Sequence, residues 1–191
     1  MFSYYLLFPW LWLLSKLPPV ALFAIGDGIA FLLNHVLSYR KKTVRSNLQK
    51  AFPEFSEERI QSTMRDFYNI LGERIAESII ALSVSKETIL QRCPVKDLGL
   101  VNKWSSENKS IVALLGHSGS WEWAGLTASM VTDYTKVFAL YNPPNNHYWN
   151  KWIKQSRERF GMQLVSMRGK GFIQYYKEKQ SNKALHLYVA D

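Results

Sequence analysis

The second half of the chain alternates short apolar runs with stretches of helical periodicity, and this alternation restricts the possible folds more than any other feature. Four apolar runs have the length and composition of buried strands: residues 111–115, 136–140, 162–165 and 184–190. Three helical stretches separate them: residues 121–130, 147–160 and 171–179. A helix between two strands returns the chain to the same end of the sheet, which favours parallel pairing. The pattern predicts an α/β fold with a mixed, largely parallel sheet flanked by helices.

Two apolar segments precede this region. A helix over residues 2–14 would span roughly 20 Å, less than the roughly 30 Å hydrocarbon core of a bilayer. Residues 20–37 are long enough to cross a bilayer marginally, but Asp27 near their middle would cost a few kcal/mol in lipid. We interpret residues 1–37 as membrane-associated helices, either an anchor or an interfacial hairpin. The alternative is a buried pair of helices in a soluble core.

A basic segment follows at once. The stretch "YRKKTVR", residues 39–45, fits a cytoplasmic position beside anionic lipid head groups. The net charge of +9 also indicates an anionic partner. We do not expect nucleic acid, because the charges lie neither on a reading helix nor among stacking aromatic side chains. Residues 40–51 predict a helix ended by Pro53, and Ser56 is the predicted N-cap of a long amphipathic helix that extends to Leu82.

The predicted organisation has three parts. Residues 1–37 are the membrane-associated region, residues 38–90 a helical region, and residues 91–191 the N-terminal part of an incomplete α/β domain. The last stretch, "ALHLYVAD", stops inside a strand pattern, so we expect a C-terminally truncated fragment. A length of 191 residues with 47% hydrophobic content allows one sizeable core. The single cysteine, Cys93, excludes an internal disulfide.

The stretch "LLGHSGSWEW", residues 114–123, contains the strongest candidate site. It predicts a strand, a loop and a helix, which places His117 just past the carboxyl end of a strand, where open α/β sheets bind ligands. Ser120 can cap the following helix, so Glu122 lies in its first turn. A carboxylate on one imidazole nitrogen fixes the tautomer and raises the basicity of the other nitrogen. The pair therefore predicts a general base that takes a proton from an alcohol or an amine.

A serine hydrolase is the first alternative. The letters "GHSGS" nearly match the G-x-S-x-G turn that exposes a nucleophilic serine, here Ser118, although Ser120 replaces the final glycine. Such an enzyme also needs a histidine later in the chain, and His147 and His186 are available. His186 lies inside a strand pattern without an evident acidic partner.

Two further alternatives use the same region differently. A metal site formed by His117, Glu122 and His147 has no recognised ligand spacing, so we expect no metal. A non-catalytic lipid-binding or membrane scaffold protein would explain the apolar N-terminus and the positive charge without any reaction.

The stretch "GHSGSWEW" resembles the His-x4-Glu signature of the bacterial lipid A biosynthesis acyltransferases, the lauroyl and myristoyl transferase branch of the lysophospholipid acyltransferase superfamily. Four further stretches resemble the family's pattern in the same order: "YRKKTVRSNLQKAFPEFSEERI", "YNPPNN", "RERFGM" and "LYVAD". The resemblance covers essentially the whole chain, which makes it far more specific than the His-Glu pair alone.

The resemblance implies an O-acyltransferase of glycolipid and lipopolysaccharide biosynthesis. Such enzymes move a fatty acyl chain from an acyl carrier protein thioester, or from acyl-coenzyme A, to a hydroxyl of a lipid acceptor at the cytoplasmic face of the bacterial inner membrane. His117 would deprotonate the acceptor and Glu122 would hold and polarise His117. The family needs neither a cofactor nor a metal, and forms no covalent acyl-enzyme.

The resemblance also implies substrate-binding residues. Arg157 and Arg159 match the family's arginine pair, expected near acceptor phosphates or developing negative charge. Asp191 matches its strand-end aspartate. Position 142 departs from the pattern, because Asn142 stands where the family has arginine, which weakens the case for phosphate contact there. A further family motif beyond Asp191 is missing, so activity of this fragment alone is not implied. The acceptor, the acyl length and the oligomeric state stay open.

Overall fold

The computed structural model describes residues 2–179 and 183–189. The chain divides into two compact units. The first comprises Met1–Phe8 and Val84–Asp191, and the second comprises Pro9–Ser83. The first helix, α1 (Phe2–Leu14), contributes residues to both.

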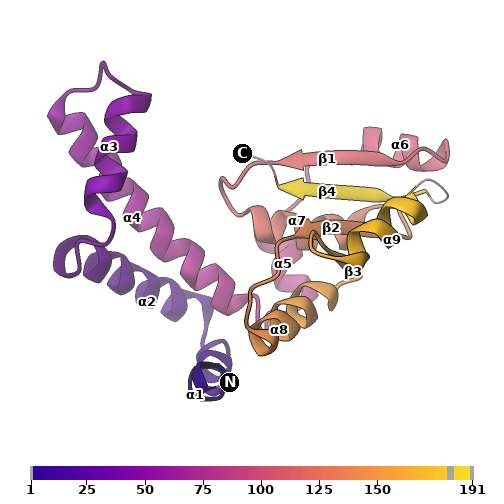
Figure 1. Ribbon diagram of the computed structural model, residues 1–191, viewed down its shortest axis with the longest axis horizontal. Helices are drawn as coiled ribbons and strands as arrows, with labels where there is room; N and C mark the ends of the chain where they lie inside the picture. Colours follow the sequence, from indigo (N-terminus) through magenta and orange to yellow (C-terminus); the bar gives the residue numbers. More distant parts are fainter. Residues whose placement is uncertain (1, 180–182, 190–191) are drawn as a thin grey trace. The chain divides into compact units, whose positions relative to one another are not determined.

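The first unit contains a parallel sheet, as the alternating pattern predicts. Its strands are β1 (Ile111–Leu115), β2 (Val137–Tyr141), β3 (Met162–Ser166) and β4 (Leu185–Val189). Their order is β1-β4-β2-β3, and all three neighbouring pairs are parallel (Figure 1). Val137 registers with Met162 on one side and with Leu185 on the other. The carboxyl ends of the strands therefore share one edge of the sheet, where ligands bind in open α/β folds.

Helices connect these strands and precede them. They are α5 (Lys86–Arg92), α6 (Gly99–Ser106), α7 (Trp121–Val131), α8 (His147–Glu158) and α9 (Lys170–Lys179). The last three follow β1, β2 and β3 in turn, which is the repeated strand–helix pattern of a parallel sheet. Asn146 caps α8, because its side chain accepts hydrogen bonds from the backbone N–H groups of Tyr148 and Trp149. The predicted segment 147–160 is thus helical to residue 158.

Alternate residues of the strands reach opposite faces of the sheet. On one face, Phe138, Val165 and Ala184 form a buried cluster with Tyr175 of α9. On the other, Met162 and Leu187 lie beside Gly125 of α7. Helices therefore pack on both faces of the sheet, as the predicted α/β architecture requires, while Val112 and Leu114 of β1 stay exposed.

The second unit is helical. Besides the rest of α1 it contains α2 (Pro19–Phe31), the π-helix η1 (Leu32–Val36), α3 (Lys41–Ala51) and α4 (Glu57–Ile80). Pro19–Val36 is long and apolar enough to cross a membrane by length and composition, and about 22% of that segment is buried. Asp27, near its middle, is exposed.

The helices α2 and α4 approach each other closely at two glycines. A Cβ atom on Gly26 would lie 2.6 Å from the carbonyl oxygen of Gly72, and a Cβ atom on Gly72 would collide with the carbonyl oxygen of Gly26. Ala30 and Ala76 follow four residues after these glycines and flank the contact. Two small residues spaced by four on both helices allow backbones to pack this closely.

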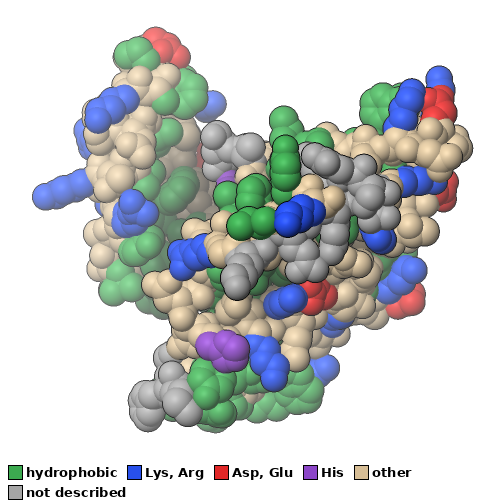
Figure 2. Space-filling view, turned by 45° about the vertical axis from the view of Figure 1, so that its right-hand side comes forward, with side chains coloured by type: hydrophobic (Ala, Val, Ile, Leu, Met, Phe, Trp, Pro, Cys, Tyr) green, Lys and Arg blue, Asp and Glu red, His purple; other side chains and the backbone are tan. Residues whose placement is uncertain are grey.

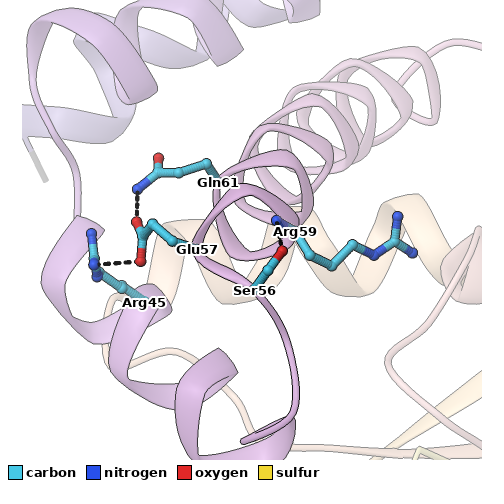
Figure 3. A network of polar contacts seen from close by, with 5 residues as sticks. All are labelled: Arg45, Ser56, Glu57, Arg59 and Gln61. Carbon is cyan, nitrogen blue, oxygen red and sulfur yellow. Dashed lines mark hydrogen bonds and ion pairs between the residues drawn. The ribbon is translucent and has the colours of Figure 1, made fainter.

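The junction between α3 and α4 is closed by polar contacts (Figure 3). Ser56 caps α4 as predicted, because its hydroxyl accepts a hydrogen bond from the backbone N–H of Arg59 at 3.2 Å. Arg45 of α3 pairs with Glu57 in the first turn of α4 at 2.7 Å, and Gln61 donates to the same carboxylate at 2.8 Å. The acidic residue thus complements the helix dipole and joins the two helices.

Candidate active site

The predicted site lies at the carboxyl edge of the sheet. His117 is in the loop between β1 and α7, and Glu122 is in the first turn of α7. Gly119, in the same loop, has φ +59°, a left-handed conformation that glycine adopts most easily. Ser120 occupies the N-cap position, but its side chain accepts no cap hydrogen bond from the described backbone of α7, which corrects the predicted capping role.

His117 is exposed and lies against an aromatic ring. Its imidazole meets the indole of Trp121 edge to face, with ring centroids 5.1 Å apart. The guanidinium of Arg157, from α8, lies 5.7 Å from the centroid of the same indole. Trp121 therefore contacts both a candidate base and a cation.

Glu122 forms an ion pair with Arg157. The Nη2 group of Arg157 donates to the carboxylate, and the two side chains are only 26% and 27% exposed. Water screens such a partly buried pair less than it screens a surface pair. The contact joins the first turn of α7 to the end of α8, two helices that follow different strands. The proposed support of His117 by Glu122 stays a prediction.

Arg159 makes contacts different from those of Arg157. Its guanidinium donates to the backbone carbonyl of Val84 at 2.5 Å and lies 4.4 Å from the ring centroid of Phe160. Desolvation lowers the pKa of Arg159 from its ordinary value, although the group stays charged at neutral pH. The structure therefore brings Arg157 to Glu122, while Arg159 contacts the segment before α5. Asp191 lies outside the described residues.

An apolar pocket lies beside the Glu122–Arg157 pair. Its lining includes Trp121, Glu122 and Arg157. Residues of all four strands complete the lining: Leu115, Ala139, Leu140, Met162, Leu164, Leu187 and Val189. Gly125 of α7 also lines it, and a Cβ atom there would lie 3.5 Å from Met162 Cε. A mostly apolar lining with a few charged groups is typical of a site for a ligand with a hydrocarbon part and a polar end.

His186, the candidate base of a hydrolase, is engaged in the core. It is fully buried in β4, its Nδ1 lies 2.6 Å from the hydroxyl of Tyr175, and its ring stacks on Phe138. Tyr175 also lies 2.9 Å from the hydroxyl of Tyr188, and burial raises the pKa of Tyr175. Ser118, in contrast, is exposed in the loop after β1. These contacts give His186 a structural role under α9.

An aromatic cluster that no sequence pattern predicted above joins α1 to α8. Tyr4 stacks on Tyr148 with centroids 5.6 Å apart, and Phe8 meets Trp152 at 5.9 Å. The spacing of four in both segments, residues 4 and 8 against residues 148 and 152, is the sequence signal that could have indicated two facing helices. The first turns of α1 therefore pack on the helix that carries Arg157.

The sequence is similar to known proteins over most of its length. Residues 1–187 match the family described as bacterial lipid A biosynthesis acyltransferase. Two relatives are the lipid A biosynthesis palmitoleoyltransferase of Escherichia coli (strain K12) and the lipid A biosynthesis acyltransferase of Shigella flexneri. Each is 25% identical over 149 residues, which cover 78% of this chain and 47% of the relative. The chain thus spans about half the length of these relatives, and it belongs to the bacterial lipid A biosynthesis acyltransferase family.

Proposed function

We propose that the protein, in its full-length form, is an O-acyltransferase of lipid A biosynthesis. It moves a fatty acyl chain from an acyl carrier protein thioester, or from coenzyme A, to a hydroxyl of a lipid A precursor or a related lipid. Family membership supports the reaction class. The observation that carries the proposal is the apolar pocket lined by Trp121, Glu122 and Arg157, together with the contact between the His117 imidazole and the Trp121 ring.

The chemistry requires a base beside a carbonyl. In this proposal, His117 takes the proton from the acceptor hydroxyl, and the oxygen attacks the thioester carbonyl carbon. The tetrahedral intermediate then expels the thiolate, which accepts the proton from the imidazolium. An ester bond forms, a thioester bond breaks, and no group is added to the enzyme. Glu122 orients the imidazole and stabilises its positive charge.

Arg157 serves this reaction through Glu122. The ion pair holds the carboxylate in place at the lining of the pocket. A guanidinium has five N–H donors, so Arg157 can hold Glu122 and still donate to a phosphate of the acceptor. Arg159 and Asp191 stay candidate acceptor-binding residues on the strength of the family pattern alone.

The apolar pocket accommodates the first part of the acyl chain. Gly125 limits this space least, because it has no side chain and faces Met162 and Leu187. A Gly125→Leu variant should therefore prefer shorter acyl donors than the parent protein. The measurement is the relative rate with donors of graded chain length, and an unchanged preference would place the acyl chain elsewhere.

The proposed location is the cytoplasmic face of the bacterial inner membrane. The apolar segment Pro19–Val36 and the basic residues after it support a membrane position. A lipid acceptor resides in the membrane, whereas an acyl carrier protein is soluble. The active site must therefore be open to both the bilayer and the cytoplasm.

Acyl transfer by the full-length protein tests the proposed base. His117→Ala and Glu122→Ala should each lower kcat by about 10²- to 10⁴-fold, the usual contribution of general base catalysis. Ser118→Ala is the matched control in the same loop and should keep the parental rate. Parental rates in both His117 and Glu122 variants would disprove the mechanism. Loss of activity in Ser118→Ala, with fluorophosphonate labelling of Ser118, would establish the hydrolase alternative.

The role of Arg157 is tested by separating kcat from KM. If Arg157 acts through Glu122, Arg157→Lys should lower kcat and leave the KM for the acceptor nearly unchanged. If it mainly binds acceptor phosphate, the KM should rise and kcat should change little. Arg159→Lys is the matched comparison, because Arg159 is near the same helix end and donates to the backbone carbonyl of Val84.

A further inference from the structure

A group of cations surrounds a hollow on the second unit. The hollow is lined by the turn before α3 and by the first residues of that helix, including Arg40, Lys41, Lys42 and Arg45, and by Gln61 of α4. Among the residues that the structure describes, Glu57 is the one carboxylate paired with this group, through Arg45. Arg40, Lys41 and Lys42 thus contribute three positive charges without an acidic partner in the described part of the chain.

An exposed apolar surface directly precedes these cations in the same unit. It consists of five side chains, each about half or more exposed: Phe31, Leu32, Val36, Leu37 and Tyr39. The turn between the two surfaces is held in place, because the hydroxyl of Tyr68 donates to the carbonyl oxygen of Tyr39 at 2.7 Å. In Figure 2, Lys and Arg side chains project beside hydrophobic side chains on the part of the surface that α3 and α4 form.

The combination of the two surfaces identifies the partner. An acidic protein or a nucleic acid would neutralise the cations but would leave the five apolar side chains in water. An anionic bilayer covers both, because its phosphates attract the cations and its acyl region accepts the apolar side chains. The exposed carboxylate of Asp27, in the middle of Pro19–Val36, is compatible with a segment that lies along the surface, where it can reach water.

We propose that the hollow around Arg40, Lys41 and Lys42 binds the phosphate of an anionic phospholipid head group and docks the second unit on the bilayer surface. Gln61 and Arg45 also line the hollow, and both contact the carboxylate of Glu57 (Figure 3). The site is separate from the proposed catalytic residues, which belong to the first unit.

Vesicle binding by the full chain tests this site. The measured quantity is the ratio of the partition constants for vesicles of phosphatidylcholine with phosphatidylglycerol and for vesicles of phosphatidylcholine alone. Each cation beside an anionic surface strengthens binding about fivefold, so Arg40→Gln/Lys41→Gln/Lys42→Gln should lower the ratio on the order of 100-fold at low salt. Binding to phosphatidylcholine alone should not change, because the apolar side chains are intact.

Two control variants separate a site from general charge. Arg40→Lys/Lys41→Arg/Lys42→Arg keeps the charge and should keep the ratio. Lys96→Gln/Lys103→Gln/Lys136→Gln removes the same charge from the first unit and should also keep it. The proposal is overturned if the Arg40/Lys41/Lys42 glutamine variant keeps the parental ratio, or if the control in the first unit loses as much.

Competition experiments distinguish other anions. If inorganic phosphate at matched ionic strength displaces the vesicles, the hollow binds free phosphate and the lipid assignment is wrong. If the glutamine variant loses binding to purified acyl carrier protein and keeps its vesicle preference, the surface belongs to an acidic protein. His117→Ala should keep the parental vesicle preference, so failure of the docking site and failure of the proposed catalytic site give different results.

Discussion

The two units of this chain differ in how their helices make contact. In the first unit, large side chains such as Leu126 of α7 are buried, with 2% exposure, and helices pack on both faces of the sheet. In the second, α2 and α4 meet through Gly26 and Gly72, where side chains are missing. Removal of atoms should therefore harm the core around α7, and addition of atoms should harm the contact between α2 and α4.

The largest effect is expected from a truncation in the first unit. Leu126→Ala should lower the free energy of unfolding by about 2–5 kcal/mol, because it removes a buried side chain and leaves a cavity. Hydrogen–deuterium exchange on peptides of the first unit measures the change. Leu100→Ala, at a position with 56% exposure, is the control and should change little. Equal effects at both positions would contradict a packed core around α7.

The second unit should respond to the addition of one methyl group. Gly26→Ala forces a Cβ atom against the backbone of α4 and should destabilise the helix pair by about 1–3 kcal/mol. Gly28→Ala is the matched control, because a Cβ atom there meets nothing within 4 Å and the better helix propensity should stabilise α2 by up to about 1 kcal/mol. Hydrogen–deuterium exchange of α2 and α4 peptides should become faster in Gly26→Ala and slower in Gly28→Ala. A change in the same direction in both variants would disprove the close approach.

A third test applies the same change to both units. Tyr68 and Tyr134 are buried, and each hydroxyl donates to a backbone carbonyl at 2.7 Å, of Tyr39 and Lys109 respectively. Replacement of either tyrosine by phenylalanine should cost about 0.5–1.5 kcal/mol, the net contribution of one hydrogen bond. Urea unfolding of both variants measures the cost. A large difference between the two would show that the units also differ in polar contacts.

The same tyrosines predict a dependence on pH. Burial raises the pKa of Tyr68 and of Tyr134 above the ordinary value of 10.0. Above about pH 10 the unfolded chain releases these protons before the folded chain does. The contribution of these two tyrosines to the free energy of unfolding should therefore be fully present below that pH and be lost as the pH rises toward the folded-state pKa values. The phenylalanine variants should lose this part of the slope, which unfolding curves at graded alkaline pH would measure.

The smallest effect is expected at the surface. Glu57 and Glu122 both lie in the first turn of a helix and pair with an arginine, but the Arg45–Glu57 pair is 43% and 56% exposed. Glu57→Gln should change the free energy of unfolding by at most about 1 kcal/mol, because water screens an exposed pair. Thermal unfolding at low and high salt measures it. A loss well above that range would show that the contact holds α3 and α4 together.

The sequence alone determined the elements whose signals are local. Strand positions and the helix after Ser56 follow from apolar periodicity and a capping hydroxyl, so neighbouring residues suffice to predict them. The same local signals were too weak to predict α5 and α6, because these helices have only seven and eight residues.

Only the tertiary structure decided which distant side chains meet. Glu122 and Arg157 are 35 positions apart in the sequence with a strand between them, and no local pattern shows that α8 returns its last turn to the start of α7. The contact between Gly26 and Gly72 and the packing of Tyr4 and Phe8 on α8 are likewise contacts between elements. The physical reason is that local preferences act over one or two turns, whereas these contacts depend on how whole helices pack against each other and against the sheet.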